Sequence, residues 1–288
     1  MKQAYITKGI APASLELLDH ANAILAEYGV RMTVRQTYYQ LVARDLIPNS
    51  VKSYRRVVRV LRDGRLTGLL DWDHIEDRLR LPHIPTTWDS IGQIVDAARD
   101  QFRKDRWAGQ LFNVEVWLEK DALAGIVGDA TRRWQVPLQV NRGYSSITAM
   151  REAALRLRRK QGNTSKDHVV IGYLGDHDPS GEDMVRDIRD RLATFGADVT
   201  VIKLAILGSD IERYDLPPQP VKATDSRADA FRQAHGEDCV ELDALRPDEL
   251  DRRVDTFIRE HLDMELWDEV IEEEDRQREA VHVDLEDV

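Results

Sequence analysis

Two stretches of the chain place carboxylates directly after apolar runs that are typical of buried strands. Glu119 follows the run LFNVEVWL, and Asp176 and Asp178 follow the run HVVIGYLG. The carboxyl ends of parallel strands meet at one edge of a sheet, where ligands of open α/β sheets gather. Along an extended backbone, a spacing of two residues points Asp176 and Asp178 to one face and His177 to the other. These carboxylates therefore predict a Mg²⁺ site formed by Glu119, Asp176 and Asp178.

A simpler interpretation of the same residues is a turn with a helix cap. Asp, Pro and Gly dominate such turns for local backbone reasons, and Pro179 and Gly181 predict a sharp turn into the next helix. The metal site is favoured because carboxylates gathered at one rim repel one another unless a cation neutralises them. His177 alone is expected to be structural or to support a ligand. Lys120 either contacts a phosphate or faces solvent.

A third group of side chains forms a basic face on a helix predicted from the Asn49-Ser50 cap to Gly64. Its apolar stripe is expected to consist of Val51, Tyr54, Val57, Val58 and Leu61. The rest of its circumference carries Lys52, Arg55, Arg56, Arg59 and Arg62. These cations predict salt-dependent binding to the phosphate backbone of double-stranded DNA. The alternative is an ordinary solvated basic face.

The two signs of charge are segregated along the chain, so the net charge of −11 does not exclude a nucleic-acid partner. From Arg31 to Arg65, nine basic residues stand against only Asp45 and Asp63. From Glu265 onward, acidic residues dominate. This acidic tail is expected to be solvated or, alternatively, to compete with DNA for the basic helix.

The elements that position the basic helix are predicted to form a winged-helix-like domain over residues 1–88. A first helix is expected after the N-cap Ser14 and before Gly29, and Thr33 is expected to cap a second helix that ends before Pro48. The basic helix is the third. The segment LTGLLDWDHIEDRL that follows fits a small β-wing or a fourth short helix.

Later in the chain, the pattern changes to strands that alternate with helices, which indicates an α/β fold. Strands are predicted at LFNVEVWL, VPLQVN, HVVIGYLGD and VTVIKLAIL, with helices near 121–134, 145–161 and 181–195. This alternation predicts βαβ units and a mostly parallel sheet over residues 109–262. Residues 89–108 are expected to form a helical linker, and residues 263–288 the acidic tail.

Length and composition narrow the classes of protein. A chain of 288 residues is long enough for two modest domains. No apolar run approaches the roughly 18 residues of a membrane span, so no membrane partner is expected. The single cysteine, Cys239, excludes an internal disulfide and a cysteine-rich zinc cluster. A reducing cytoplasm is favoured, with association to the nucleoid if DNA is the partner.

The motifs LEKDAL and YLGDHDPSG resemble the Glu and Asp-x-Asp signature of Toprim domains, which have a Rossmann-like fold. The form with Pro and Gly after the acidic pair most resembles the A subunit of topoisomerase VI and its meiotic double-strand-break relatives. The intervening NRGYSSITA is also similar to that family. The resemblance implies that Glu119, Asp176 and Asp178 hold Mg²⁺ against the scissile phosphate.

The same family carries a tyrosine nucleophile on a winged-helix-like domain before the Toprim domain, and the segment VRQTYY matches its pattern. The resemblance implies that Tyr39 attacks the phosphate and forms a 5′-phosphotyrosyl link. Tyr38 takes a position where the family has another aromatic residue. Arg35 lies four residues before Tyr39, on the same helical face, where it would hold the phosphate. By spacing alone, a Tyr-Tyr pair in an amphipathic helix is usually a packing feature.

The resemblance also implies partners. In this family the tyrosine of one protomer works with the metal site of the other, so a homodimer is expected. The ATPase of topoisomerase VI is a separate subunit, and this chain has no Gly-x-x-x-x-Gly-Lys loop, which puts strand passage in doubt. The chain is shorter than the full A subunit and most resembles compact homologues from bacterial mobile elements and phages. Glu241 and Asp243 are expected to be structural.

Three functions follow from these residues. The first is a topoisomerase-like DNA transesterase that uses Mg²⁺ and Tyr39. The second is a Toprim nuclease that hydrolyses DNA with activated water and does not need the tyrosine. The third is a DNA-binding protein without catalysis, in which the acidic residues are structural.

Overall fold

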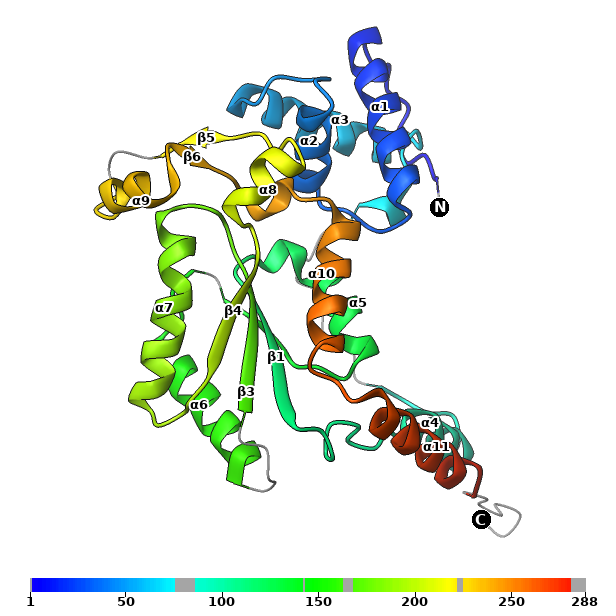
Figure 1. Ribbon diagram of the computed structural model, residues 1–288. Coiled ribbons are helices and arrows are strands. Elements are labelled where there is room, and N and C mark those ends of the chain that lie inside the picture. The colour runs from blue at the N-terminus through cyan, green and yellow to red at the C-terminus, as the bar shows by residue number, and fades with distance from the viewer. Residues whose placement is uncertain (1, 76–85, 142, 163–167, 222–224, 281–288) are drawn as a thin grey trace.

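A parallel four-stranded sheet lies at the centre of the molecule (Figure 1). The computed structural model describes residues 2–75, 86–141, 143–162, 168–221 and 225–280, with the backbone alone for 159–162. The strands are β1 (Phe112–Leu118), β2 (Leu138–Val140), β3 (His168–Leu174) and β4 (Thr200–Ala205), in the order β2-β1-β3-β4. The prediction of an α/β fold with a parallel sheet is confirmed.

Helices cover both faces of this sheet because its strands are apolar on both sides. On one face, Val114, Val116 and Leu118 pack in a cluster with α5 (Ala124–Arg133) and α10 (Pro247–Arg259). On the other face, Trp117 and Tyr173 pack against α6 (Ile147–Gly162) and α7 (Pro179–Thr194).

The strand order places a topological switch point between β1 and β3. The chain leaves β1 through the 3₁₀ turn η2 (Asp121–Leu123) and α5 to reach β2 on one side. It then returns to β3 and continues through α7 to β4 on the other side. At such a point the connections diverge and leave a crevice at the carboxyl ends of the strands. Glu119 and Asp176 follow the two strands that border this crevice.

The N-terminal part consists of α1 (Pro12–Tyr28), α2 (Val34–Ala43), α3 (Val51–Leu66) and the 3₁₀ turn η1 (Trp72–His74). Thr33 caps α2 as predicted, in a reciprocal arrangement with Gln36. Gly29 ends α1 in the left-handed conformation, at φ 63°. The predicted start of α1 is wrong: the helix begins at Pro12 rather than after Ser14, because proline fits the first helical position.

The buried face of α3 differs from the predicted stripe. Val57, Val60 and Leu61 are buried, whereas Val51 and Val58 are exposed. The reason is a close approach of α1: a Cβ at Gly64 would lie 2.6 Å from a methyl carbon of Leu18. Contact at Gly64 turns the face that contains residues 57, 60, 61 and 64 inward.

The region predicted as a β-wing or a fourth short helix contains, in the described residues, the 3₁₀ turn η1 and isolated β-bridges. Met32 pairs with Ile75, and Ala4 pairs with Thr67, each as a single bridge. The rest of this predicted segment, residues 76–79, lies outside the described residues.

A small lobe that the sequence did not predict is inserted between β4 and α10. It contains α8 (Gly208–Arg213), β5 (Gln219–Pro220), α9 (Ala228–His235), β6 (Asp238–Cys239) and the 3₁₀ turn η3 (Leu242–Ala244). Strands β5 and β6 pair in antiparallel fashion. His177 and Val240 exchange two backbone hydrogen bonds of 2.9 Å, which fasten the lobe to the turn after β3. The lobe therefore lies over the carboxyl edge of the sheet (Figure 1).

The predicted linker and acidic tail form α4 (Ile91–Gln101) and α11 (Met264–Ala280), which lie together at the end of the molecule far from α3 (Figure 1). Within α11, Trp267 and Glu274 are buried, and Glu274 accepts hydrogen bonds from Arg106 and Arg278. The expectation of a simply solvated tail is wrong for this segment, because part of it packs. Residues 281–288 lie outside the described residues.

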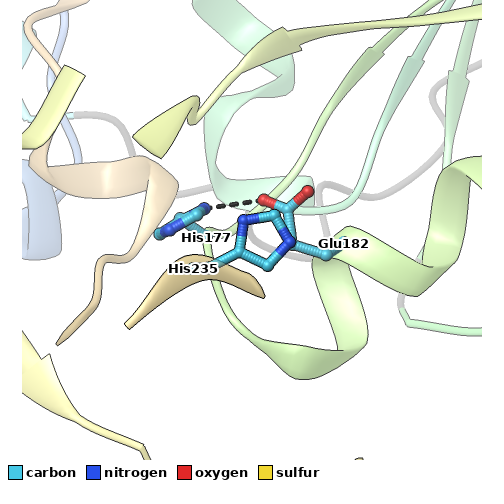
Figure 2. A group of neighbouring side chains, drawn as sticks. All are labelled: His177, Glu182 and His235. Carbon is cyan, nitrogen blue, oxygen red and sulfur yellow. Dashed lines mark hydrogen bonds and ion pairs between the residues drawn. The ribbon is translucent and has the colours of Figure 1, made fainter. Parts of the chain in front are cut away.

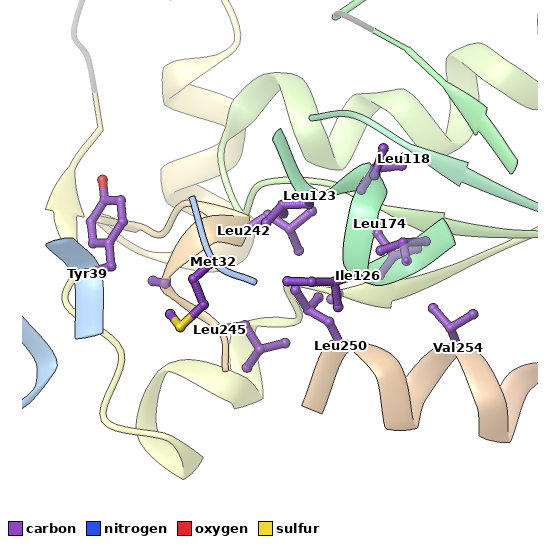
Figure 3. Packing of buried hydrophobic residues seen from close by; sticks show 14 of the residues in the cluster. Met32, Tyr39, Leu118, Leu123, Ile126, Leu174, Leu242, Leu245, Leu250 and Val254 are labelled. Atoms are coloured by element: carbon purple, nitrogen blue, oxygen red, sulfur yellow. The ribbon is translucent and has the colours of Figure 1, made fainter. Parts of the chain in front are cut away.

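One hydrophobic cluster joins the N-terminal helices to the sheet. Figure 3 shows Met32 and Tyr39 at one end of the cluster and Leu118 and Leu174, from β1 and β3, further along it. Leu250 of α10 continues it. This shared core fixes α2 over the carboxyl edge of the sheet.

No helix in the described ranges is both long and apolar enough to cross a membrane.

Candidate active site

Glu119 and Asp176 lie next to each other at the switch point. The Glu119 Oε2 atom accepts hydrogen bonds from the Asp176 backbone N–H, at 3.1 Å, and from the Tyr173 hydroxyl, at 3.0 Å. The Glu119 backbone N–H donates to the Leu174 carbonyl at 2.9 Å, which continues the pairing of β1 and β3 beyond their ends. The structure thus brings these two predicted ligands to one rim.

Asp178 caps α7 while it lines the same cavity as Asp176. Its Oδ1 accepts from the backbone N–H groups of Ser180 and Gly181, at 3.0 and 2.7 Å, and from the Ser180 hydroxyl. A Cβ at Gly181 would lie 2.1 Å from the Asp176 carbonyl oxygen, so only glycine fits this turn. The cavity, of about 220 Å³, is lined by both aspartates. Asp178 therefore caps α7 and lines the cavity at the same time.

Lys120 is neither solvent-facing nor free, because three carboxylates surround its ammonium group. The Nζ atom lies 2.8 Å from Asp176, 3.0 Å from Glu241 and 2.9 Å from Asp243. Burial alone would lower the pKa of Lys120, but these three carboxylates outweigh it and raise that pKa. The lysine is therefore charged and joins the rim to the segment before α10.

The carboxyl of Asp176 is only partly compensated by this lysine. Burial raises the pKa of Asp176 to about 6, Lys120 opposes this shift, and Glu119 adds to it. The Leu242 N–H also donates to Asp176, at 2.7 Å. Asp243 is fully buried, and among the described residues its Oδ1 has no hydrogen-bond partner. Glu119, Asp176, Asp178, Glu241 and Asp243 together form what we call the acidic rim. This rim carries more negative charge than Lys120 neutralises.

Arg35 connects α2 to the same carboxylates. Its guanidinium forms an ion pair with Glu241, and its Nε lies 3.6 Å from Asp243. Burial alone would lower the pKa of Arg35, but Glu241 and Asp243 outweigh burial and raise that pKa above its usual value. Arg35 and Lys120 therefore share Glu241 and Asp243 between the helical part and the sheet.

Tyr39 lies beside this network and is only 3% exposed. Its hydroxyl accepts a hydrogen bond from Gln219 at 3.0 Å, and the Arg35 guanidinium carbon lies 5.9 Å from its ring centre. Burial raises the pKa of Tyr39 to about 12, Glu241 adds to the rise, and Arg35 opposes it. The tyrosine is thus protonated at neutral pH, and a nearby cation favours the charged form.

Tyr38 has a different environment from Tyr39. Its hydroxyl donates to Asn49 at 2.9 Å and accepts from the Ser50 backbone N–H at 2.8 Å. These bonds fix the start of α3, so Tyr38 is a structural residue.

The cavities beside the tyrosine and beside the aspartates share a wall. Tyr39 and Arg35 line a cavity of about 550 Å³, and Gln219, Pro220 and Glu241 line both this cavity and the one at Asp176. The candidate nucleophile and the aspartates of one chain therefore line two cavities that adjoin at these residues.

The predicted basic face divides into two groups. Lys52, Arg55 and Arg59 are exposed and form no ion pair with the described residues. Arg56 donates to the Ala13 carbonyl at 2.6 Å, and Arg62 pairs with Asp63 at 2.8 Å. Arg56 therefore ties α3 to α1, and the first three side chains remain for a ligand.

Among the described residues, the one group of His, Cys, Asp or Glu whose three donor atoms all lie within 4.8 Å of one another is His177, Glu182 and His235. Glu119, Asp176 and Asp178 are not such a group. Their carboxylates share a rim, but that of Asp178 turns toward α7 and that of Asp176 toward Lys120.

Sequence reasoning missed the partners of Glu241, Asp243 and Gln219. Glu241 and Asp243 were expected to be structural, and their ion pairs with Lys120, and that of Glu241 with Arg35, fit such a role. A signal was present, since the two acids repeat the two-residue spacing of Asp176 and Asp178 after an apolar residue. No sequence pattern indicated that Gln219 contacts Tyr39.

Comparisons with known proteins give no relative. No protein-family model, no curated protein and no solved structure matches this chain.

Proposed function

We propose that this chain cleaves double-stranded DNA by transesterification, with Tyr39 as the nucleophile and an Mg²⁺ ion at the acidic rim, as a winged-helix and Toprim protein similar to the topoisomerase VI A subunit. The observation that carries the proposal is the wall of Gln219, Pro220 and Glu241 shared by the two cavities. This wall supports the proposal because the tyrosine, two cations and the carboxylates then border two adjoining cavities, where one phosphodiester would contact them.

The reaction at this site is an exchange of one ester for another. The Tyr39 oxygen bonds to phosphorus, the bond from phosphorus to the 3′ oxygen breaks, and the tyrosine proton ends on that 3′ oxygen. The products are a 5′-phosphotyrosyl link and a 3′ hydroxyl. Because the phosphodiester energy is kept in the new ester, resealing requires no nucleotide.

The residues of the rim fit a hard divalent cation. Mg²⁺ binds oxygen ligands, often through one or two carboxylates together with substrate phosphate. Glu119, Asp176 and Asp178 would hold it, and the unpartnered Oδ1 of Asp243 is a further oxygen nearby. When bound, Mg²⁺ supplies positive charge to the phosphate under attack.

The chain's own cations orient the substrate. Arg35 would bind a non-bridging phosphate oxygen, and its charge favours the tyrosinate form of Tyr39. Gln219 donates a hydrogen bond to the Tyr39 hydroxyl, which would also stabilise the tyrosinate. Lys52, Arg55 and Arg59 of α3 would bind the DNA backbone away from the cleavage point.

Covalent trapping tests the proposal. Supercoiled plasmid is incubated with protein and Mg²⁺, with and without ATP, denatured with detergent, and compared before and after proteinase treatment. We expect protein on the 5′ ends with the wild-type chain, and a loss of cleavage of at least about 1000-fold with Tyr39→Phe. Tyr38→Phe is the matched control and should stay active. Full activity of Tyr39→Phe would refute the tyrosine mechanism.

The burial of Tyr39 favours a second candidate, a metal-dependent nuclease that uses activated water. Tyr39 is only 3% exposed and its hydroxyl is bonded to Gln219, whereas the Asp176 side chain is 15% exposed. This function predicts protein-free ends, unchanged cutting by Tyr39→Phe and loss of cutting by Asp176→Ala. DNA binding without any cleavage in Mg²⁺ or Mn²⁺ would point to the non-catalytic function.

We further propose that the chain acts as a homodimer, as the resemblance implies, and that any ATPase is a separate protein. The shared wall favours a Tyr39 that works with the acidic rim of its own chain, whereas the resemblance implies the rim of the partner. For a dimer, sedimentation equilibrium should give a molecular mass of twice the 33.1 kDa of one chain.

A further inference from the structure

Two histidines and a glutamate meet where the lobe contacts the β3–α7 turn (Figure 2). His177 comes from the turn itself, Glu182 from the first turn of α7, and His235 from the last residue of α9. One donor atom from each lies within 4.8 Å of the other two. The His177 and His235 rings are nearly perpendicular, with their centres 5.4 Å apart.

His177 is buried, and only one of its two ring nitrogens has a hydrogen-bond partner among the described residues. The side chain is 1% exposed, its Nδ1 lies 2.6 Å from the Glu182 Oε1, and its Nε2 has no partner among the described residues. Of the two ring nitrogens, Nδ1 is the one that faces Glu182 (Figure 2), so Nδ1 is the atom that would bind an ion in this group.

We propose that His177, Glu182 and His235 bind one transition-metal ion of the Zn²⁺ class, with a fourth coordination position open to solvent. Two imidazoles and one carboxylate are a common ligand set for Zn²⁺ and the neighbouring first-row ions, and differ from the all-oxygen sets of Mg²⁺. This inference goes beyond DNA cleavage and does not depend on it.

The geometry is close to what a tetrahedral ion requires. Bonds of about 2.0 Å place the ligand atoms about 3.3 Å apart. The 2.6 Å hydrogen bond between His177 Nδ1 and Glu182 Oε1 would be replaced by bonds from Nδ1 and from the other carboxylate oxygen to the ion, and a donor atom at the 4.8 Å limit would move in by about 1.5 Å. His235 is exposed, which gives an ion a path to the buried His177.

One neighbouring cation restricts how Glu182 can bind. The Lys203 ammonium lies 2.6 Å from the Glu182 Oε1 and 2.9 Å from the Asp176 carbonyl oxygen. The Glu182 Oε2 is therefore the oxygen left for a metal. Binding at this oxygen would clamp the end of α9 to the turn that carries Asp176 and Asp178, and so would fix the lobe over the acidic rim.

Cobalt titration tests this site separately from DNA cleavage. Chelator-treated protein is titrated with Co²⁺ in excess Mg²⁺, which occupies oxygen-ligand sites, and visible absorption and heat of binding are recorded. We expect one Co²⁺ per chain with the strong visible bands of a four-coordinate nitrogen and oxygen site, and displacement by Zn²⁺. His235→Ala should weaken binding at least about 100-fold and abolish the bands. His168→Ala, an exposed histidine at the opposite end of β3, is the control and should bind normally.

Thermal unfolding gives a second readout. Zn²⁺ should raise the melting temperature of the wild type and of His168→Ala, but not that of His235→Ala, because a ligand that binds only the folded state stabilises it. Asp178→Asn should retain Co²⁺ binding even if it cleaves no DNA. Absence of Co²⁺ bands in the wild type, or equal binding by His235→Ala, would refute the site.

Discussion

At the scale of single residues, the ammonium of Lys120 determines the charge balance of the acidic rim. It touches Asp176, Glu241 and Asp243, and Arg35 is the second cation on the last two. Removal of one partner from a buried ionic group leaves uncompensated charge, which is far more costly than loss of an exposed pair.

Substitution of Lys120 should therefore expose the affinity of the rim for cations. We expect Lys120→Met to destabilise the fold by about 3 kcal/mol, since three carboxylates lose their shared cation. Mg²⁺ should restore part of this loss, so its effect on the melting temperature should be larger in Lys120→Met than in the wild type. Lys52→Met, at an exposed site, is the control and should show neither effect. A Mg²⁺ response no larger than that of the wild type would argue against a cation at the rim.

The burial of Tyr39 predicts how cleavage depends on pH. Its pKa is raised to about 12, so the tyrosinate fraction increases about tenfold per pH unit below that value. Single-turnover formation of the covalent complex should therefore accelerate with pH across the neutral and mildly alkaline range. A rate independent of pH there would show that Tyr39 ionisation does not limit the reaction.

At the scale of elements, the sequence predicted features, such as helix caps, that depend on residues close together in the chain. Thr33 and Ser50 cap α2 and α3 where expected, because a capping oxygen acts within three residues. The rotation of α3 was not predictable, since the contact between Gly64 and Leu18 is a tertiary one. The lobe was missed because β5 and β6 have two residues each, too few for any periodicity.

Some contacts of the candidate site could likewise be predicted from the sequence, and others could not. Glu119 and Asp176 could be placed together because parallel strands end at one edge. The contacts of Glu241 with Arg35 and of Gln219 with Tyr39 join positions about two hundred residues apart. Contacts of that range depend on how the lobe folds back over α2, which no short pattern encodes.

The packing of α10 on α8 provides an element-scale prediction. Hydrogen bonds from Arg252 lower the pKa of Glu249 to about 2, against burial, and Arg253 and Tyr214 contribute. Because this pKa is below its unfolded value of 4.5, the stabilisation is complete above pH 4.5 and is lost as pH falls toward 2. Glu249→Gln should lower the unfolding free energy by roughly 2 kcal/mol at pH 7, and by less at pH 3.

Urea unfolding at several pH values measures this difference. Glu272→Gln, which changes an exposed glutamate of α11, is the matched control and should change stability little at any pH. A Glu249→Gln deficit that stays constant down to pH 3 would show that the carboxylate charge is not what stabilises α10.

At the scale of the whole molecule, opposite charges occupy opposite ends. The exposed cations of α3 lie at the end that carries the Tyr39 cavity, which residues 49–51 and 54 help to line. Helix α11, with its acidic residues, lies at the other end (Figure 1). This separation allows an anionic polymer to approach the tyrosine along α3 in spite of the net charge of −11.

The salt dependence of DNA binding tests this arrangement. Each phosphate contact contributes about 0.9 to the slope of log affinity against log salt, because the contact releases counterions. If Arg55 and Arg59 each bind a phosphate, the double variant Arg55→Gln and Arg59→Gln should reduce that slope by about 2. Arg151→Gln with Arg189→Gln removes the same charge from exposed sites on α6 and α7, which cover one face of the sheet, and should leave the slope unchanged. Equal slopes for the two double variants would mean that the DNA responds only to net charge and does not lie along α3.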